Sequence, residues 1–171
     1  MISMIVVAIF SIVAMLLAWN WQKKHANAGV VDVVWAFGMM FAGPWYALTG
    51  TAPLFLKLSL GVLTFSWFWR LGRHLQRRVF REAEDGRYHA MRKAMKGRAD
   101  LGFLLFFLLQ AGFIWLLSLP FWAVAQNTKP QTPFVVAALV IAVLALYGET
   151  TADRQIAEFR NNLEHRGLTH I

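Results

Sequence analysis

Five long apolar runs divide the chain, and polar segments separate them. The runs cover residues 2–19, 28–50, 52–69, 101–125 and 133–148. A helix needs about 20 apolar residues to cross a hydrocarbon core about 30 Å thick, and the shorter runs reach that length by extending about a turn into their flanks. No internal repeat or soluble domain interrupts this pattern. We therefore expect a single all-α membrane domain over residues 1–171, a polytopic bundle of about five transmembrane helices.

Basic residues gather on alternate sides of the predicted spans. The chain is 58% hydrophobic yet carries 17 Lys and Arg against 9 Asp and Glu, a combination atypical of soluble domains. Short basic loops stay cytoplasmic, which predicts an outside N-terminus and a cytoplasmic C-terminus. The anionic inner leaflet accounts for the excess of positive charge, so we expect membrane lipids and no nucleic acid as partners. The basic residues on the predicted cytoplasmic side are Lys23, Lys24, Arg70, Arg73, Arg77, Arg78, Arg81, Arg87, Arg92, Lys93, Lys96, Arg98, Arg154, Arg160 and Arg166.

Asp32 is an ionisable residue about one turn inside the second predicted span. A carboxylate at this depth costs free energy unless it has a partner or a role. One interpretation is a local pair with Lys23, Lys24 or a neighbouring arginine near the headgroups. The other is a functional acid, and the sequence leaves both open.

A second group of polar residues lies where the fifth span reaches the cytoplasmic side. Read as one helix, Glu149, Asp153 and Arg160 fall at positions i, i+4 and i+11, which is one face. Two carboxylates one turn apart repel, more so where a membrane lowers the dielectric constant. Either loop arginines such as Arg70, Arg73 or Arg77 neutralise them, or the face is turned toward a polar ligand.

The third polar place is the segment from Arg81 to Arg92, which mixes both charges with Tyr88. Its Asp85–Gly86 pair predicts a turn. The arginines here are typical of a solvated loop beside lipid, although an arginine cluster next to a turn also suits an anion. Cysteine is absent and the five histidines share no ligand spacing, so no metal site is expected.

At these three places the chain resembles the bacterial, uncharacterised branch of the steroid 5-alpha reductase superfamily, whose relatives include sterol reductases and isoprenylcysteine methyltransferases. The matching stretches occur in the family's order over nearly the whole chain. They are Asn27 with Val31-Asp32-Val33-Val34-Trp35 and Gly38, Glu84-Asp85-Gly86-Arg87-Tyr88 with Arg92, Ser118-Leu119-Pro120, Gly148-Glu149 with Ala152-Asp153 and Gln155, and Phe159-Arg160.

The resemblance implies a bacterial inner-membrane enzyme that passes a hydride from NADPH to a carbon–carbon double bond of a lipid-like substrate. Glu149, Asp153 and Arg160 match the spacing with which the reductases hold the cofactor. Tyr88 and Asp32 are the candidate catalytic residues, as donors toward a substrate carbonyl. The methyltransferase relatives imply S-adenosylmethionine as the alternative to NADPH.

Members of that family continue with a stretch like GLW-x-YSRHPNY and further spans. This chain ends at Ile171, so the resemblance implies an N-terminal portion of the family fold. The alternative to an enzyme is then a non-catalytic remnant, or a subunit that pairs with a separate C-terminal half.

Overall fold

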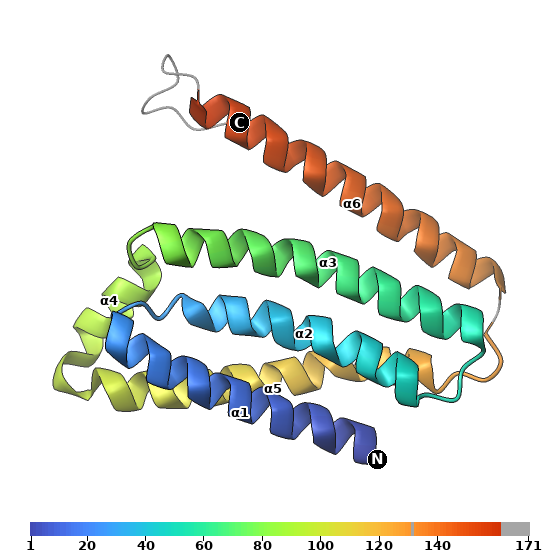
Figure 1. Cartoon of the computed structure of the whole chain (residues 1–171), viewed down its shortest axis with the longest axis horizontal. Helices are drawn as coiled ribbons and strands as arrows, with labels where there is room; N and C mark the ends of the chain where they lie inside the picture. Colours follow the sequence, from blue (N-terminus) through green and yellow to red (C-terminus); the bar gives the residue numbers. More distant parts are fainter. Residues whose placement is uncertain (131, 162–171) are drawn as a thin grey trace. The chain divides into compact units, whose positions relative to one another are not determined.

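The computed structural model describes residues 1–130 and 132–161. The chain divides into two compact units, Met1–Lys129 and Pro130–Ile171. The first contains α1 (Ile2–His25), α2 (Val30–Thr49), α3 (Leu54–Arg81), α4 (Gly86–Met95), the short 3-10 helix η1 (Lys96–Arg98) and α5 (Ala99–Ala125). The second contains α6 (Thr132–Asn161). Figure 1 shows these elements, and each unit is described by itself.

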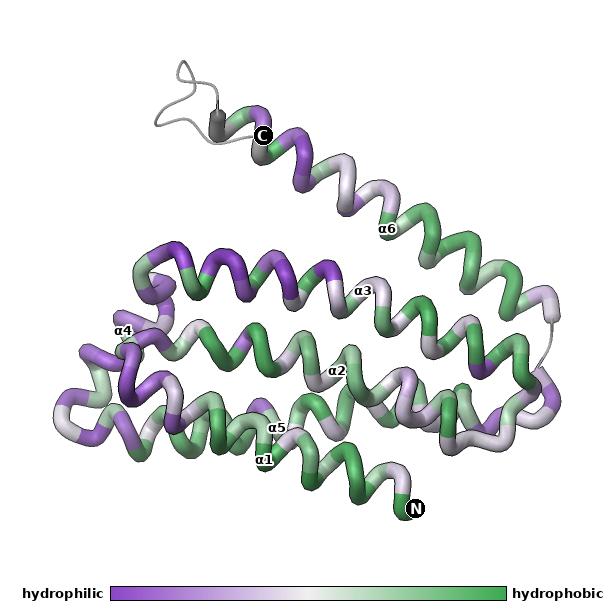
Figure 2. The backbone as a smooth tube through the Cα atoms, viewed as in Figure 1, coloured by the Kyte–Doolittle hydropathy of each residue, from purple (hydrophilic) through white to green (hydrophobic). Residues whose placement is uncertain are grey.

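The prediction of an all-α membrane protein is confirmed. In the described residues, five helices are long and apolar enough to cross a membrane: α1, α2, α3, the stretch that contains α5, and α6. Three of them, α1, α3 and α6, continue past the apolar runs into polar sequence. Good helix formers are frequent in those extensions, with Gln and Lys in α1, Arg and Leu in α3, and Glu, Ala and Arg in α6, so the helices continue beyond the apolar segments. Figure 2 shows this change along α3, which is mostly apolar at its start and hydrophilic toward α4.

Local sequence explains where the helices of the first unit begin and end. Ala26 ends α1 in the left-handed conformation, with φ of 49°. Gly50 caps the C-terminus of α2 with extended backbone, and Pro53 precedes α3. At the same end of the bundle, the backbone N–H of Ala52 donates to the carbonyl of Ala125 at 2.9 Å. The loop after α2 is thereby fastened to the end of α5.

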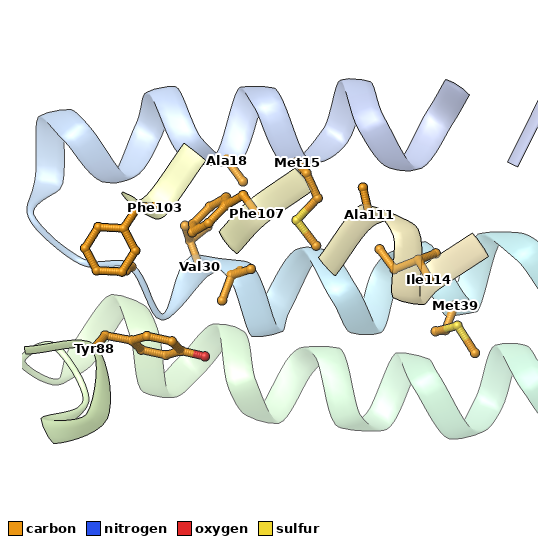
Figure 3. Packing of buried hydrophobic residues seen from close by; sticks show 11 residues of the cluster. Met15, Ala18, Val30, Met39, Tyr88, Phe103, Phe107, Ala111 and Ile114 are labelled. Carbon is orange, nitrogen blue, oxygen red and sulfur yellow. The ribbon is translucent and has the colours of Figure 1, made fainter. Parts of the chain in front are cut away.

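Helix α2 is the central element of the first unit and packs against α1, α3 and α5. Small residues allow close approach, because a Cβ on Gly38 would lie 2.8 Å from Ile114 Cδ1 on α5. The core near α4 combines side chains from four helices, as Figure 3 shows. Its buried members include Met15, Val30, Tyr88, Phe103, Phe107 and Ile114. This packing carries Tyr88 of α4 to the beginning of α2.

Candidate active site

The site is built where the turn between α1 and α2 meets the end of α3. Asn27 lies in that turn and is 9% exposed. Its side-chain amide donates to the carbonyl of Val79 at 3.1 Å, and its side-chain oxygen accepts the backbone N–H of Gly29 at 3.0 Å. One side chain therefore joins α3 to the first turn of α2 and satisfies a backbone donor that the helix leaves unpaired.

Glu84 holds the same turn from the other side. Its carboxylate accepts the backbone N–H of Ala28 at 2.8 Å and the guanidinium of Arg92 at 2.8 and 3.2 Å. Arg92 also donates to the side-chain oxygen of Gln22 on α1 at 3.0 Å. Burial raises the pKa of the Glu84 carboxyl, but these hydrogen bonds outweigh burial and hold the pKa below its ordinary value of 4.5. Glu84 is therefore an ionised link between α1, α2 and α4.

Asp85 starts α4 as its N-cap. Its carboxylate accepts the backbone N–H of Arg87 at 2.9 Å and the Arg87 side chain at 3.1 Å, and it pairs with Arg78 of α3. The backbone hydrogen bond from Arg87, with the two guanidinium groups, lowers the pKa of Asp85 from 3.8 to about 2. The Asp85–Gly86 pair, predicted as a turn, thus begins a helix whose direction is fixed by α3.

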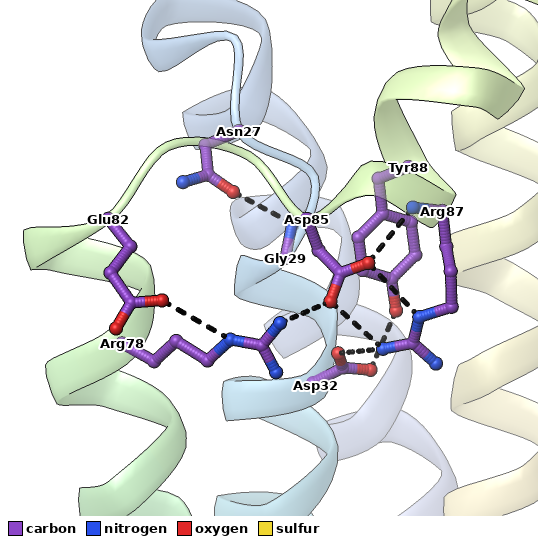
Figure 4. A network of polar contacts seen from close by, with 8 residues as sticks. All are labelled: Asn27, Gly29, Asp32, Arg78, Glu82, Asp85, Arg87 and Tyr88. Atoms are coloured by element: carbon purple, nitrogen blue, oxygen red, sulfur yellow. Dashed lines mark hydrogen bonds and ion pairs between the residues drawn. The ribbon is translucent and has the colours of Figure 1, made fainter. Parts of the chain in front are cut away.

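Tyr88 and Asp32 come together at the centre of this arrangement (Figure 4). The hydroxyl of Tyr88 donates to Oδ1 of Asp32 at 2.7 Å, and the Arg87 guanidinium lies 3.8 Å from Oδ2. Tyr88 is 5% exposed, whereas the Asp32 side chain is 37% exposed. Of the two interpretations of Asp32, the pairing with a nearby arginine is therefore present, and a buried tyrosine hydroxyl shares the same carboxylate.

A small recess lies beside this pair. Its volume is about 20 Å³, and polar groups of both charges line it. A volume of about 10–15 Å³ already accommodates one water molecule, which needs two to four polar partners. The recess has those partners next to Asp32, so it suits a water molecule and not a substrate. The lining residues are Asn27, Gly29, Asp32, Leu75, Arg78, Val79, Ala83 and Asp85.

The family described as a protein of unknown function, DUF1295, matches residues 18–170. The chain belongs to this family. No curated protein and no solved structure matches it. The DUF1295 match spans both the Tyr88–Asp32 pair and α6, and the family description carries no activity, substrate or cofactor.

The candidate cofactor residues of this DUF1295 protein lie on α6, in the second unit. Glu149, Asp153 and Arg160 belong to one continuous helix, as the spacing predicted. The side chain of Arg160 lies outside the described part of the structure. Thr150 and Thr151 donate their hydroxyls to the carbonyls one turn earlier, at 2.7 and 2.9 Å.

Two features of the DUF1295 site were outside the reach of the sequence. Gln22 is fully buried beneath Arg92, although it stands in the chain between Trp21 and Lys23 as an ordinary interfacial residue. In the sequence, Glu84 and Arg92 are matching positions of the family resemblance and have no predicted role. Helical periodicity could not predict the pair of Glu84 and Arg92, because Glu84 precedes α4 and only Arg92 lies in that helix. In the described residues no cluster of three His, Asp or Glu side chains is arranged to hold a metal.

Proposed function

We propose that this protein is a membrane-embedded reductase that uses NADPH to saturate an activated carbon–carbon double bond in a lipid-like substrate. The observation that carries the proposal is the hydrogen bond from the Tyr88 hydroxyl to Asp32, at 2.7 Å. A buried hydroxyl next to a carboxyl group, at the polar end of a membrane bundle, is suited to hydrogen-bond and protonate a carbonyl oxygen. The resemblance to the steroid 5-alpha reductase superfamily supplies the reaction class.

Tyr88 acts on the substrate oxygen in this proposal. Reduction of an enone develops negative charge on the carbonyl oxygen, and the Tyr88 O–H stabilises that charge and then transfers its proton to the oxygen. The Asp32 carboxylate then takes up a proton from water in the adjoining recess and passes it to Tyr88 through the hydrogen bond that joins them. The Arg87 guanidinium, 3.8 Å from Oδ2, stabilises the carboxylate that remains. The enol product takes a solvent proton on its α-carbon and releases its O–H proton to solvent, which gives the ketone.

NADPH, when bound, supplies the two electrons of the reaction as a hydride to the β-carbon of the substrate. The donor and acceptor chemistry of α6 fits this cofactor. Glu149 and Asp153, one turn apart on one helix, can accept from ribose hydroxyls and the carboxamide. Arg160, further along the same helix, has the fork geometry that suits a phosphate.

Cofactor binding tests the proposal most directly. The full chain is reconstituted in lipid nanodiscs and titrated with NADPH. Asp153→Asn and Arg160→Gln should each weaken binding roughly tenfold to over a hundredfold, because each removes a charge-assisted hydrogen bond of about 1.5–3 kcal/mol. Glu158→Gln and Arg154→Gln make the same charge changes on the same helix and should leave the affinity unchanged. Equal losses in both sets would refute the assigned cofactor residues.

Turnover separates the roles of the two units. With lipids that contain an enone, Tyr88→Phe should retain NADPH affinity and stop NADPH oxidation. Binding of S-adenosylmethionine without NADPH would instead identify a methyltransferase. Binding of neither cofactor by the reconstituted chain would refute the reductase and favour the non-catalytic alternative.

A further inference from the structure

The arginines near α4 fall into two groups that differ in their partners. Three of them pair with carboxylates of the protein. Arg78 pairs with Glu82 and Asp85. Arg87 pairs with Asp85 and Asp32. Arg92 pairs with Glu84. The charges of these three side chains are therefore already balanced by carboxylates of the protein.

The second group is a row along α3 formed by Arg73, Arg77 and Arg81, which we call the α3 arginine row. All three side chains are exposed. In the part of the chain that the structure describes, none of the three makes an ion pair. The residues are four positions apart, so successive Cα atoms are separated by about 6 Å along the helix. Three positive charges therefore follow one another along the helix without an internal acid.

Aromatic rings continue the α3 arginine row toward the apolar part of the helix. The Arg73 guanidinium lies 5.5 Å from the ring centroid of Trp69, one turn earlier, and Trp69 stacks on Phe65 with centroids 6.0 Å apart. Trp69 is 45% exposed. Tryptophan at the end of a span marks the level at which hydrocarbon gives way to headgroups. The row therefore begins at the membrane interface.

A second pair of the same kind stands on α1. Lys23 lies 4.6 Å above the ring of Trp19, again one turn earlier, and α1 ends beside α4 as α3 does (Figure 1). The Trp19 indole also donates to the Asp100 carbonyl at 2.9 Å, which fixes the ring. Two helices that run to the same end of the bundle thus each place a cation just beyond an indole, as expected at one membrane surface.

We propose that Trp69 and the α3 arginine row form a binding site for the phosphate of an anionic phospholipid. The phosphodiester lies against the guanidinium groups, which bind phosphate oxygens in a bidentate manner. The acyl chains lie along the apolar face of α3, where Phe65 and Val62 are exposed. The site is separate from Asp32 and Tyr88, so its test does not depend on the proposed reductase activity.

Lipid affinity in nanodiscs tests this site. The full chain is placed in phosphatidylcholine nanodiscs with a small fraction of spin-labelled phosphatidylglycerol, and bound label is measured by electron paramagnetic resonance. Replacing all three arginines of the row with Gln should weaken phosphatidylglycerol binding about tenfold or more, since each basic residue at an anionic surface contributes about 1 kcal/mol. The matched control replaces Lys93, Lys96 and Arg98 with Gln, which removes the same charge from the end of α4 and from η1. We expect a change of about twofold or less there.

Three further arms make the result specific. Replacing the row with Lys keeps the charge but loses the bidentate geometry, so binding should fall between wild type and the Gln variant. Excess inorganic phosphate should not displace the labelled lipid, and Arg77→Gln alone should weaken binding in a chain of unchanged helicity. Equal losses in the row and control variants, or displacement by inorganic phosphate, would overturn the proposal in favour of general charge attraction or a site for free anions.

Discussion

Glu84 accepts the backbone N–H of Ala28 at 2.8 Å, across 56 positions of the chain. Four residues further along both segments, Tyr88 donates to Asp32 with the same separation of 56 positions. The two contacts therefore dock α4 onto the beginning of α2 in a single register. Glu84 fixes the backbone at one point, and Tyr88 meets Asp32 one helical turn away.

Removal of the Glu84 charge should destabilise the first unit strongly. The Glu84 side chain is 8% exposed and the Arg92 side chain 26% exposed, and Glu84→Gln leaves that guanidinium without its anion. Loss of one partner of a buried pair costs roughly 3–5 kcal/mol, and we expect about 3 kcal/mol here because Arg92 keeps some solvent. Unfolding in mixed detergent micelles measures the change. Glu82→Gln, at a carboxylate 65% exposed, should cost about 0.5 kcal/mol or less, and a similar loss in both variants would contradict the role of Glu84.

Acid should weaken the cap of α4 through Asp85. The pKa of Asp85 is about 2 in the folded protein against an ordinary value of 3.8, so its ionised form favours folding. This contribution is fully present above 3.8 and is lost as the pH falls through that value toward 2. Asp85→Asn keeps an N-cap side chain but lacks the charge. The difference in unfolding free energy between wild type and Asp85→Asn should therefore shrink over this pH range, and a constant difference would show that the charge is not responsible.

The contact between α2 and α3 should not tolerate a side chain at Gly43. A Cβ there would clash with Thr64, whose own Cβ would be 2.5 Å away. Gly43→Ala should cost about 1–3 kcal/mol through overpacking, measured as a lower unfolding free energy in micelles. Gly112→Ala on α5, where nothing lies within 4 Å of the added Cβ, is the control and should be neutral or stabilising. Partial rescue of Gly43→Ala by Thr64→Gly would assign the cost to this pair.

The orientation in the membrane remains a prediction from the Lys and Arg distribution. Reporters fused after Gly50 and after Lys129 should be detected outside, and a reporter after Arg87 should be detected in the cytoplasm. Alkaline phosphatase and green fluorescent protein give opposite signals for the two sides. A cytoplasmic signal after Lys129 would contradict the five-span topology.

The sequence predicted the five spans because each apolar run alone carries enough transfer free energy to define a transmembrane helix. The polar ends of α1, α3 and α6 extend beyond those runs, since hydropathy does not report where a helix of polar and charged residues stops. Asp32 could be recognised as a candidate by its depth in the span. Its pairing with Tyr88 could not be derived from local patterns, because it depends on a contact between segments 56 positions apart.

The Gln22, Glu84 and Arg92 cluster was hidden for a related reason. Each residue is of a type that abounds near the ends of membrane helices, and only burial distinguishes these three from their neighbours. The sequence likewise does not distinguish paired arginines from unpaired ones. Arg77, Arg78 and Arg81 look alike in the chain, yet Arg78 alone among them pairs with acids in the described residues.

The link between Glu84 and Ala28 also sets an order of events during synthesis. The chain emerges from its N-terminus, so α1 and α2 are complete before the ribosome has added Glu84. Until then the N–H groups at the start of α2 depend on Asn27 and interfacial water. The polar contacts at the start of α2 are therefore incomplete while only α1 and α2 have been made. They are completed only after α3 and α4 have been added and Glu84 can accept the N–H of Ala28.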